Sequence, residues 1–196
     1  MTAQESELAA PSPATTFPIT LSVDAMGGDM GPAAVVSGCA KSARKNPRLG
    51  FILHGPEDEL TKLVARRKHL AGRVTIRDAG GVVTMDDKPS QGVRAGKGTS
   101  MWAAIDAVRS GEATVAVSCG NTGALMALSM IRLRKLPGVN RPAIAVLYPS
   151  RNPHAFNVML DVGAEIRTHA PDLLRFALMD PSYARPGLEQ RRTHEG

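Results

Sequence analysis

The fold is decided by residues 19–32, which read ITLSVDAMGGDMGP. The first five of these residues alternate apolar and polar side chains, as a half-buried β-strand does. A glycine-rich turn follows from Gly27 to Gly31. Pro32 then suits the first turn of a helix, where its missing amide hydrogen is not needed. The stretch therefore predicts a strand, a tight turn and a helix in direct succession.

The same succession repeats along the chain. The first helix has an apolar stripe of Val36, Cys39, Ala40 and Ala43, and Pro47 ends it. Strands that alternate with helices indicate a parallel or mostly parallel sheet with helices on both faces. Residues 79–99, rich in glycine and charge, are expected to form a long functional loop. Further strands are predicted at 49–53, 74–76, 114–117, 143–147 and 156–160, and helices at 60–70, 101–108, 121–136 and 172–179.

The composition indicates the cellular compartment of the protein and the charge of its partners. Residues 1–18 are rich in Ala, Ser, Thr and Pro, which predicts a disordered leader, and they lack the basic start of a secretory signal. Two cysteines without metal-ligand spacing favour a reducing, cytoplasmic compartment. The net charge of +6 and the pI of about 9.7 favour acidic partners. The basic residues near 62–68 are interpreted as a solvated helix face.

The first chemical cluster is the turn that contains Asp24, Gly27, Gly28 and Asp29. A glycine turn that opens a helix offers free amide hydrogens and a positive dipole end to an anion. Two carboxylates would repel a phosphate unless a cation or a donor compensates for them. Asp29 could instead cap the helix and Asp24 could hold the turn, so a structural role and a binding role both stay open here.

A second strand-to-helix turn spans residues 118–123, and its candidate binding residues are Gly120, Asn121, Thr122 and Gly123. Asn121 or Thr122 can cap the following helix, and the glycines let a ligand approach the backbone closely. A cap alone is the alternative reading. It is weakened because two such turns are expected to lie along one edge of the sheet.

Other polar residues are individually weaker candidates. Lys88 and Lys97 in the long loop could contact a phosphate, although single loop lysines are usually only solvated. Thr99 or Ser100 could cap the next helix. His54 ends a predicted strand and is a weak site candidate. Asp161 ends another strand, where it could orient a ligand or cap a turn.

Cys119 could in principle act as a nucleophile in thioester chemistry. The sequence offers it no evident histidine partner, and cysteine is among the most buried residue types. We therefore expect Cys119 to be a small buried residue.

The order of these motifs resembles the phosphate acyltransferases of bacterial phospholipid synthesis. The resemblance covers about residues 19–185 and is closest to the alphaproteobacterial branch of that family. The tail at 186–196 diverges from it. The combined order of these motifs indicates a particular family far more specifically than a single glycine loop does. The motifs that carry the resemblance are VDAMGGD at 23–29 with Gly31-Pro32, His54-Gly55, VTMDDKPS at 83–90, KGTSMW at 97–102, CGNTGA at 119–124 and LDVGA at 160–164.

The resemblance implies a fold, a reaction and partners. The fold would be a three-layer α/β sheet similar to isocitrate and isopropylmalate dehydrogenases and phosphotransacetylases. Phosphate would attack acyl-acyl carrier protein to give an acyl phosphate, without a metal or organic cofactor. The enzyme would be a cytoplasmic homodimer at the membrane surface, with a glycerol-3-phosphate acyltransferase downstream and no nucleic acid. Family members commonly carry Ala where Cys119 stands.

Under this resemblance the expected catalytic residues are Lys97, Asn121 and Asp24, and no metal site is expected. The expected substrate- and phosphate-binding residues are Gly27, Gly28, Asp29, His54, Lys88, Ser100, Gly120, Thr122, Gly123 and Asp161.

Family members are much longer, so the chain is expected to correspond to their N-terminal part, with an incomplete sheet. Two alternatives stay open. The chain could be an inert remnant or a module that binds the carrier protein or a membrane. It could also be another phosphate-binding enzyme, such as a phosphotransacetylase relative. A Gly-x-Gly-x-x-Gly fingerprint, which a dehydrogenase would show, is not found in the sequence.

Overall fold

The computed structural model describes residues 17–135, 137, 139, 142–151, 156–161 and 169–179. These residues belong to two units, Met1–Leu133 and Arg134–Gly196, which are described separately. Most of the expected leader and the whole divergent tail lie outside the described residues.

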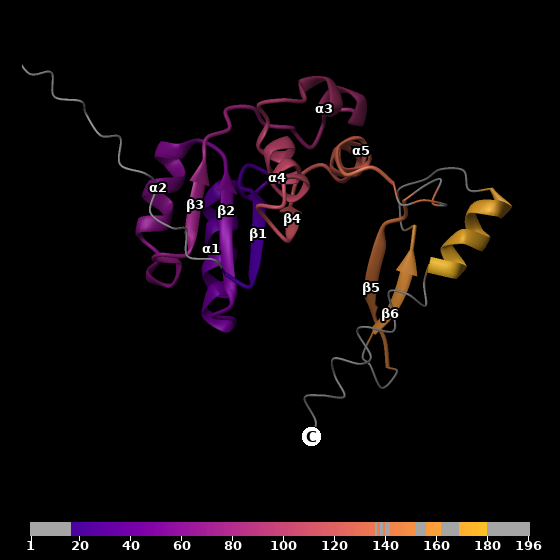
Figure 1. Ribbon diagram of the computed structural model, residues 1–196, viewed down its shortest axis with the longest axis horizontal. Helices are drawn as coiled ribbons and strands as arrows, with labels where there is room; N and C mark the ends of the chain where they lie inside the picture. The colour runs from indigo at the N-terminus through magenta and orange to yellow at the C-terminus, as the bar shows by residue number, and fades with distance from the viewer. Residues whose placement is uncertain are drawn as a thin grey trace, which may run out of the picture. The chain divides into compact units, whose positions relative to one another are not determined.

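The first unit is built on four parallel strands in the order β3-β2-β1-β4 (Figure 1). The strands are β1 (Ile19–Asp24), β2 (Leu49–His54), β3 (Val74–Arg77) and β4 (Val115–Ser118). β1 pairs with β2 from Ile19↔Leu49 to Asp24↔His54, and it pairs with β4 up to Asp24↔Ser118. The α/β class expected from the sequence is confirmed, and the strand ends with polar residues meet at one edge of the sheet.

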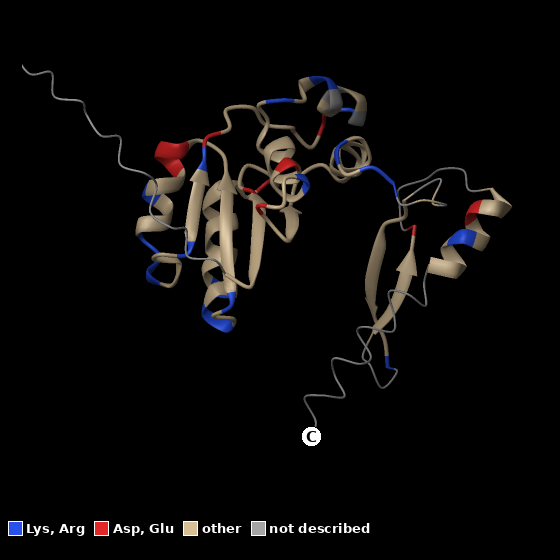
Figure 2. Cartoon of the chain, in the orientation of Figure 1, with Lys and Arg blue, Asp and Glu red and all other residues tan. Residues whose placement is uncertain are grey.

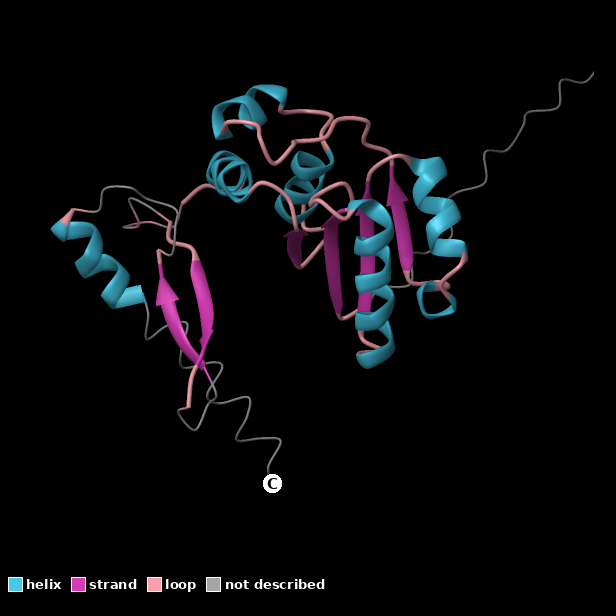
Figure 3. Ribbon diagram, turned by 180° about the vertical axis from the view of Figure 1, so that it is seen from behind, coloured by secondary structure: helices cyan, strands magenta, loops and turns pink. Residues whose placement is uncertain are grey.

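Helices cover both faces of this sheet. α1 (Gly31–Lys45) packs its four predicted stripe residues against one face, where Phe51 and Leu53 of β2 lie (Figure 3). α4 (Ser100–Arg109) packs against the other face, where Ile52 contacts the Ala107 region. Because successive strand residues point to opposite faces, Ser22 and Asp24 of β1 and His54 of β2 all lie on the α4 face.

Two predicted segments differ in detail. The helix expected to reach residue 70 ends earlier: α2 (Glu57–Ala65) stops at Arg66, and a 3-10 turn, η1 (Lys68–Leu70), follows. Leu70 is still buried, because the turn brings its side chain back to the core. The expected loop at 79–99 contains a short helix, α3 (Pro89–Ala95), where a Cβ at Gly92 would come within 2.9 Å of Ala124. Glycine at this position therefore allows close packing on the helix that contains Ala124.

α5 (Thr122–Arg132) is shorter than the predicted 121–136. Ala124 and Leu128 are buried, while Ile131 and Leu133 near its end are exposed. The guanidinium of Arg132 pairs with Asp106 of α4 and lies 4.5 Å from the centroid of the Trp102 ring. These contacts tie α5 to α4, which in turn packs on the strands next to the polar edge.

The second unit contains a two-stranded antiparallel sheet, formed by β5 (Ala145–Pro149) and β6 (Phe156–Leu160). Residues 170–179 are helical, close to the predicted 172–179. Across both units, none of the helices that the structure describes is long and apolar enough to span a bilayer.

Candidate functional site

The carboxylate of Asp24 is the centre of the polar edge. Its Oδ1 accepts a hydrogen bond of 2.6 Å from Ser100 Oγ, and its Oδ2 accepts one of 2.7 Å from Ser118 Oγ. The backbone N–H of Met26 donates to Oδ1 at 3.2 Å. Asp24 is only 2% exposed, so these donors replace water around its oxygens. The carboxylate thus joins the end of β1 to the start of α4 and the end of β4.

The two glycine turns predicted from the sequence lie against each other at this point. A Cβ on Gly27 would come within 2.8 Å of Asp24 Oδ2, of Ser118 Oγ and of the backbone nitrogen of Gly120. Gly28 has a φ of +96°, and a Cβ there would meet the Cys119 carbonyl at 3.0 Å. Both positions leave no room for a side chain, so the backbones of the two turns are in close contact.

Asp29 does not cap α1. The residue at the cap position is Met30, and it makes no side-chain capping hydrogen bond. Asp29 is exposed, next to the positive end of the α1 dipole.

Asn121 is buried and uses both ends of its amide. Its Oδ1 accepts from the N–H of Ala124 at 3.0 Å, which caps α5. Its Nδ2 lies 3.2, 3.1 and 2.7 Å from the carbonyl oxygens of Thr84, Met85 and Asp87, respectively. The capping role weighed for Asn121 is present, and the same side chain holds the loop 84–87 against the start of α5.

The remaining loop candidates lie around this centre. Thr99 caps α4 by accepting from Trp102 N at 3.2 Å, which leaves the Ser100 hydroxyl to donate to Asp24. Lys97 is exposed three residues before Ser100, and Lys88 is exposed at the start of α3. Gly120 donates its N–H to Ser118 Oγ at 3.0 Å. Thr122 and Gly123 form the first turn of α5, with Thr122 exposed.

A mainly apolar cavity of about 410 Å³ opens beside the Asp24 centre. One end is lined by Asp24, Gly28 and Asp29, and the rest by apolar residues of the sheet and one flank of α1, among them Val35 and Val117. A cavity of this size, apolar with a few polar groups at one end, is typical of a small-molecule site.

The expectation that Cys119 is buried is wrong. It is exposed and lines this cavity, because it follows the last residue of β4 and lies over Gly28. The other cysteine, Cys39, is buried, and burial raises its pKa to about 11, with the nearby Cys119 adding to the effect. Its thiol is therefore protonated at neutral pH and does not act as a nucleophile.

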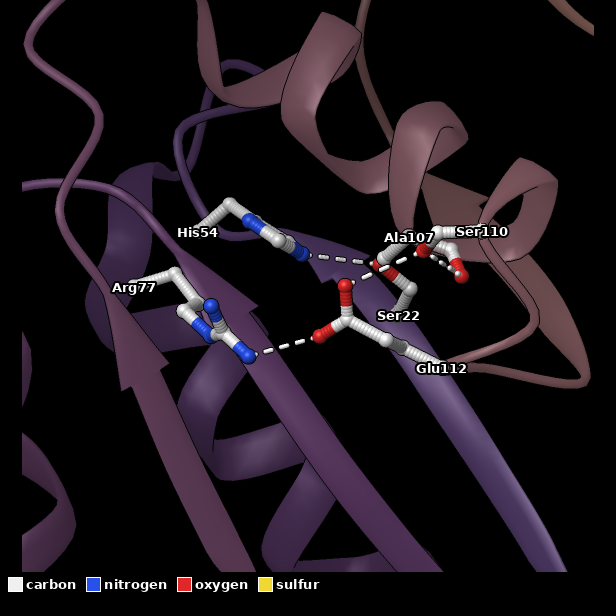
Figure 4. Close-up of polar contacts among 6 residues, drawn as sticks. All are labelled: Ser22, His54, Arg77, Ala107, Ser110 and Glu112. Carbon is white, nitrogen blue, oxygen red and sulfur yellow. Dashed lines mark hydrogen bonds and ion pairs between the residues drawn. The ribbon is translucent and has the colours of Figure 1, made fainter.

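His54 lies beside Asp24 in the strand register but makes a separate contact. Its Nε2 is 2.8 Å from Ser22 Oγ, and its Nδ1 is buried without a partner among the described residues (Figure 4). In front of the ring, Arg77 and Glu112 form an ion pair of 2.6 Å. Burial, followed by the nearby Arg77 charge, lowers the pKa of His54 from 6.5 to about 4, against smaller opposite effects of Asp24 and Glu112.

This shift predicts a pH-dependent stability. Between pH about 4 and 6.5 the unfolded chain binds a proton at position 54 that the folded chain does not. The free energy of unfolding should therefore fall as pH falls through this window, by up to about 1.4 kcal/mol per pH unit from this group, and stay level above it. Urea unfolding at a series of pH values measures the slope. A His54→Gln variant should show a shallower slope, and equal slopes would contradict the assignment.

Asp161 belongs to the second unit, directly after β6. Its φ is 61°, its N–H donates to the Ile144 carbonyl at 2.8 Å, and its Oδ1 is buried without a partner in the described part of the chain. The described residues hold no group of three or more His, Cys, Asp or Glu side chains that could bind a metal.

No site role for Ser22 is expected from the sequence, which places Ser118 in the second turn without a role. Ser22 reads as the polar side of an alternating strand, yet it is fully buried against His54. Ser118 reads as the end of a strand, and only its register with Asp24 reveals that it is a donor. A serine at an inward position near a strand end is the signal that could have found both.

The chain is similar to a family of known proteins. A family model described as "Fatty acid synthesis protein" matches residues 19–194. A protein of Roseobacter denitrificans named "Phosphate acyltransferase" is 73% identical over 178 residues, which are 91% of this chain and 50% of that protein. Proteins of the same name from Ruegeria sp. and Paracoccus denitrificans are each 69% identical and are covered to 48%. The chain thus spans about half the length of these relatives.

Proposed function

The chain belongs to the fatty acid synthesis protein family, and from this premise we propose that it transfers a fatty acyl group from acyl-acyl carrier protein to inorganic phosphate. The observation that supports this most is the polar centre at Asp24 beside the apolar cavity. The cavity suits an acyl chain, and the amide hydrogens of the glycine turns suit the oxygens of a phosphate and of a thioester carbonyl.

In this reaction a phosphate oxygen attacks the carbonyl carbon of the thioester. The new C–O bond forms, the C–S bond breaks, and the carrier protein leaves as a thiolate that takes up a proton. Phosphate is already a competent nucleophile, so the protein has to position it and stabilise the negative charge on the carbonyl oxygen. No covalent acyl-enzyme is needed.

The described residues suggest how the roles are divided. Asp24 is surrounded by donors, so it acts by holding Ser100 and Ser118 in place rather than by contacting an anion. Lys97 is exposed three residues before Ser100 and could supply the positive charge for phosphate, with Lys88 as a second cation. Asn121 acts as a positioning residue, because it fixes the loop that precedes Lys88.

We also propose, from the resemblance, that the protein acts as a homodimer at the surface of a membrane. Its acyl phosphate would be consumed by a membrane acyltransferase that acylates glycerol 3-phosphate.

The test is the phosphate-dependent release of free carrier protein from acyl-acyl carrier protein by the 196-residue chain. We expect the rate to saturate with phosphate. Lys97→Ala should lower that rate about 100-fold with the fold intact, which is the effect of removing one stabilising group from a site of this kind. Arg94→Ala, at another exposed cation of the same loop region, serves as the control. A folded chain that binds the carrier protein without turnover would overturn the proposal, and unchanged turnover in Lys97→Ala would remove the role of that lysine.

A further inference from the structure

The second half of α1 and the segment after α2 together form a depression of about 400 Å³. We name it the basic depression. Its charged lining residues are Lys41, Arg44, Arg66, Arg67 and Lys68, with His69 beside them. From the sequence, Arg66, Arg67 and Lys68 are interpreted as an ordinary solvated helix face. The structure places them opposite two cations of another helix, and none of the described residues that line the depression is acidic.

The charges of the basic depression are not neutralised by the described part of the chain. None of its five Lys and Arg residues takes part in an ion pair there. All five are exposed. The acidic residues of α2 lie in its first turn, Glu57 to Glu59, at the other end of that helix. Figure 2 shows this separation, with blue at one end of α1 and α2 and red at the opposite end of α2.

The basic depression is separate from the candidate site. α1 begins at Gly31, which lines the apolar cavity, and its 15 residues end at Lys45. At 1.5 Å per residue the helix is about 22 Å long, so its basic end lies near the opposite edge of the sheet. The cavity and the basic depression also use different flanks of α1: Val35 and Gly38 line the first, and Ala40 and Arg44 line the second.

We propose that the basic depression docks the acidic surface of the acyl carrier protein, an inference that rests on the proposed function. Complementary charge steers association and fixes the register of two proteins, so five cations that the described part of the chain does not neutralise select a partner with an acidic surface. Five exposed, flexible cations without a buried donor form a poor site for one small anion but suit a broad acidic surface. The concave shape fits a convex protein surface better than a flat bilayer. Docking here leaves the flank of α1 that lines the cavity free for the acyl group.

The test measures binding of fluorescently labelled carrier protein to the full 196-residue chain by anisotropy, without phosphate. A double variant, Arg44→Glu with Arg67→Glu, reverses charge on both walls of the basic depression. It should weaken binding about tenfold or more and reduce its dependence on salt. The matched control is Arg134→Glu with Arg151→Glu, which changes the net charge equally at two exposed residues of the other unit and should bind as the wild type does. Neutral Lys41→Ala with Arg66→Ala provides a milder second variant, and circular dichroism verifies the folding of each.

Further measurements separate this proposal from the proposed function. Turnover of a small acyl-pantetheine thioester with phosphate bypasses docking, so it should be unchanged in the double variant. Loss of carrier binding in the double variant supports docking, whether or not the wild type shows turnover. Absence of turnover in a wild type that binds the carrier protein would overturn only the proposed function. Equal binding by wild type and double variant overturns docking. Docking is also overturned if the double variant still binds the carrier protein but no longer binds vesicles of equal parts phosphatidylglycerol and phosphatidylcholine, which the wild type binds.

Discussion

Asp24→Ala is expected to lower the free energy of unfolding by about 3–5 kcal/mol and to abolish phosphate-dependent turnover. The substitution removes the acceptor of the Ser100 and Ser118 hydroxyls and of the Met26 N–H. Asp24 and Ser100 are buried, so water does not readily replace the lost partner. Urea unfolding of the wild type and the variant measures the loss, and carrier-protein release measures turnover.

Asp24→Asn is the control variant that keeps the shape of the Asp24 side chain. It keeps the volume of the side chain and one acceptor oxygen, and one serine hydroxyl can turn to accept from the new amide. We expect it to cost about 1 kcal/mol, the size of one ordinary hydrogen bond. If Asp24→Ala were as stable as Asp24→Asn, the carboxylate would not be the centre that holds these segments together.

Gly27→Ala is the second large effect. The added methyl would lie 2.8 Å from a backbone nitrogen, a carboxylate oxygen and a serine oxygen at once. The three atoms belong to Gly120, Asp24 and Ser118, and none is the free end of a long side chain. The two turns must therefore separate, and we expect a loss at the upper end of the range of about 1–3 kcal/mol that overpacking costs. Thermal or urea unfolding measures it.

Gly38→Ala is the matched control for Gly27→Ala. Gly38 lies inside α1, and a Cβ there would meet no heavy atom of the described residues within 4 Å. Because alanine favours a helix interior more than glycine does, the variant should gain about 0.5–1 kcal/mol. If both glycine variants had the same stability, close contact of the two turns would be excluded as the reason for glycine at position 27.

Regular patterns made much of the fold predictable. The four residues expected to form the buried stripe of the first helix are the four buried residues of α1. The alternation at 19–23 and the run at 49–53 give β1 and β2, whose parallel pairing follows from the helix between them. The expectation that two glycine turns share one sheet edge is also confirmed, because parallel strands end together.

Other features depend on contacts that no local pattern records. α3 forms inside a glycine-rich loop because it packs on α5, which is distant in the sequence. The antiparallel pairing of β5 and β6 differs from the parallel strands before them, and a short apolar strand reads the same in either direction. Asn121 combines a predictable cap with an amide nitrogen that lies within hydrogen-bond distance of three carbonyl oxygens. These carbonyls belong to a loop more than 30 residues away, which only the folded chain brings near.

The hydrogen bonds at Asp24 have a consequence for the time course of folding. They join residues 76 and 94 positions apart, so each requires the closure of a long loop before it can form. Such contacts are costly in chain entropy and tend to form after the local helix and strand pairings. Substitutions at Asp24 should then act mainly on the rate of unfolding and leave the rate of folding nearly unchanged. A chain in which these four oxygen atoms have met has already completed the long loop closures of its sheet.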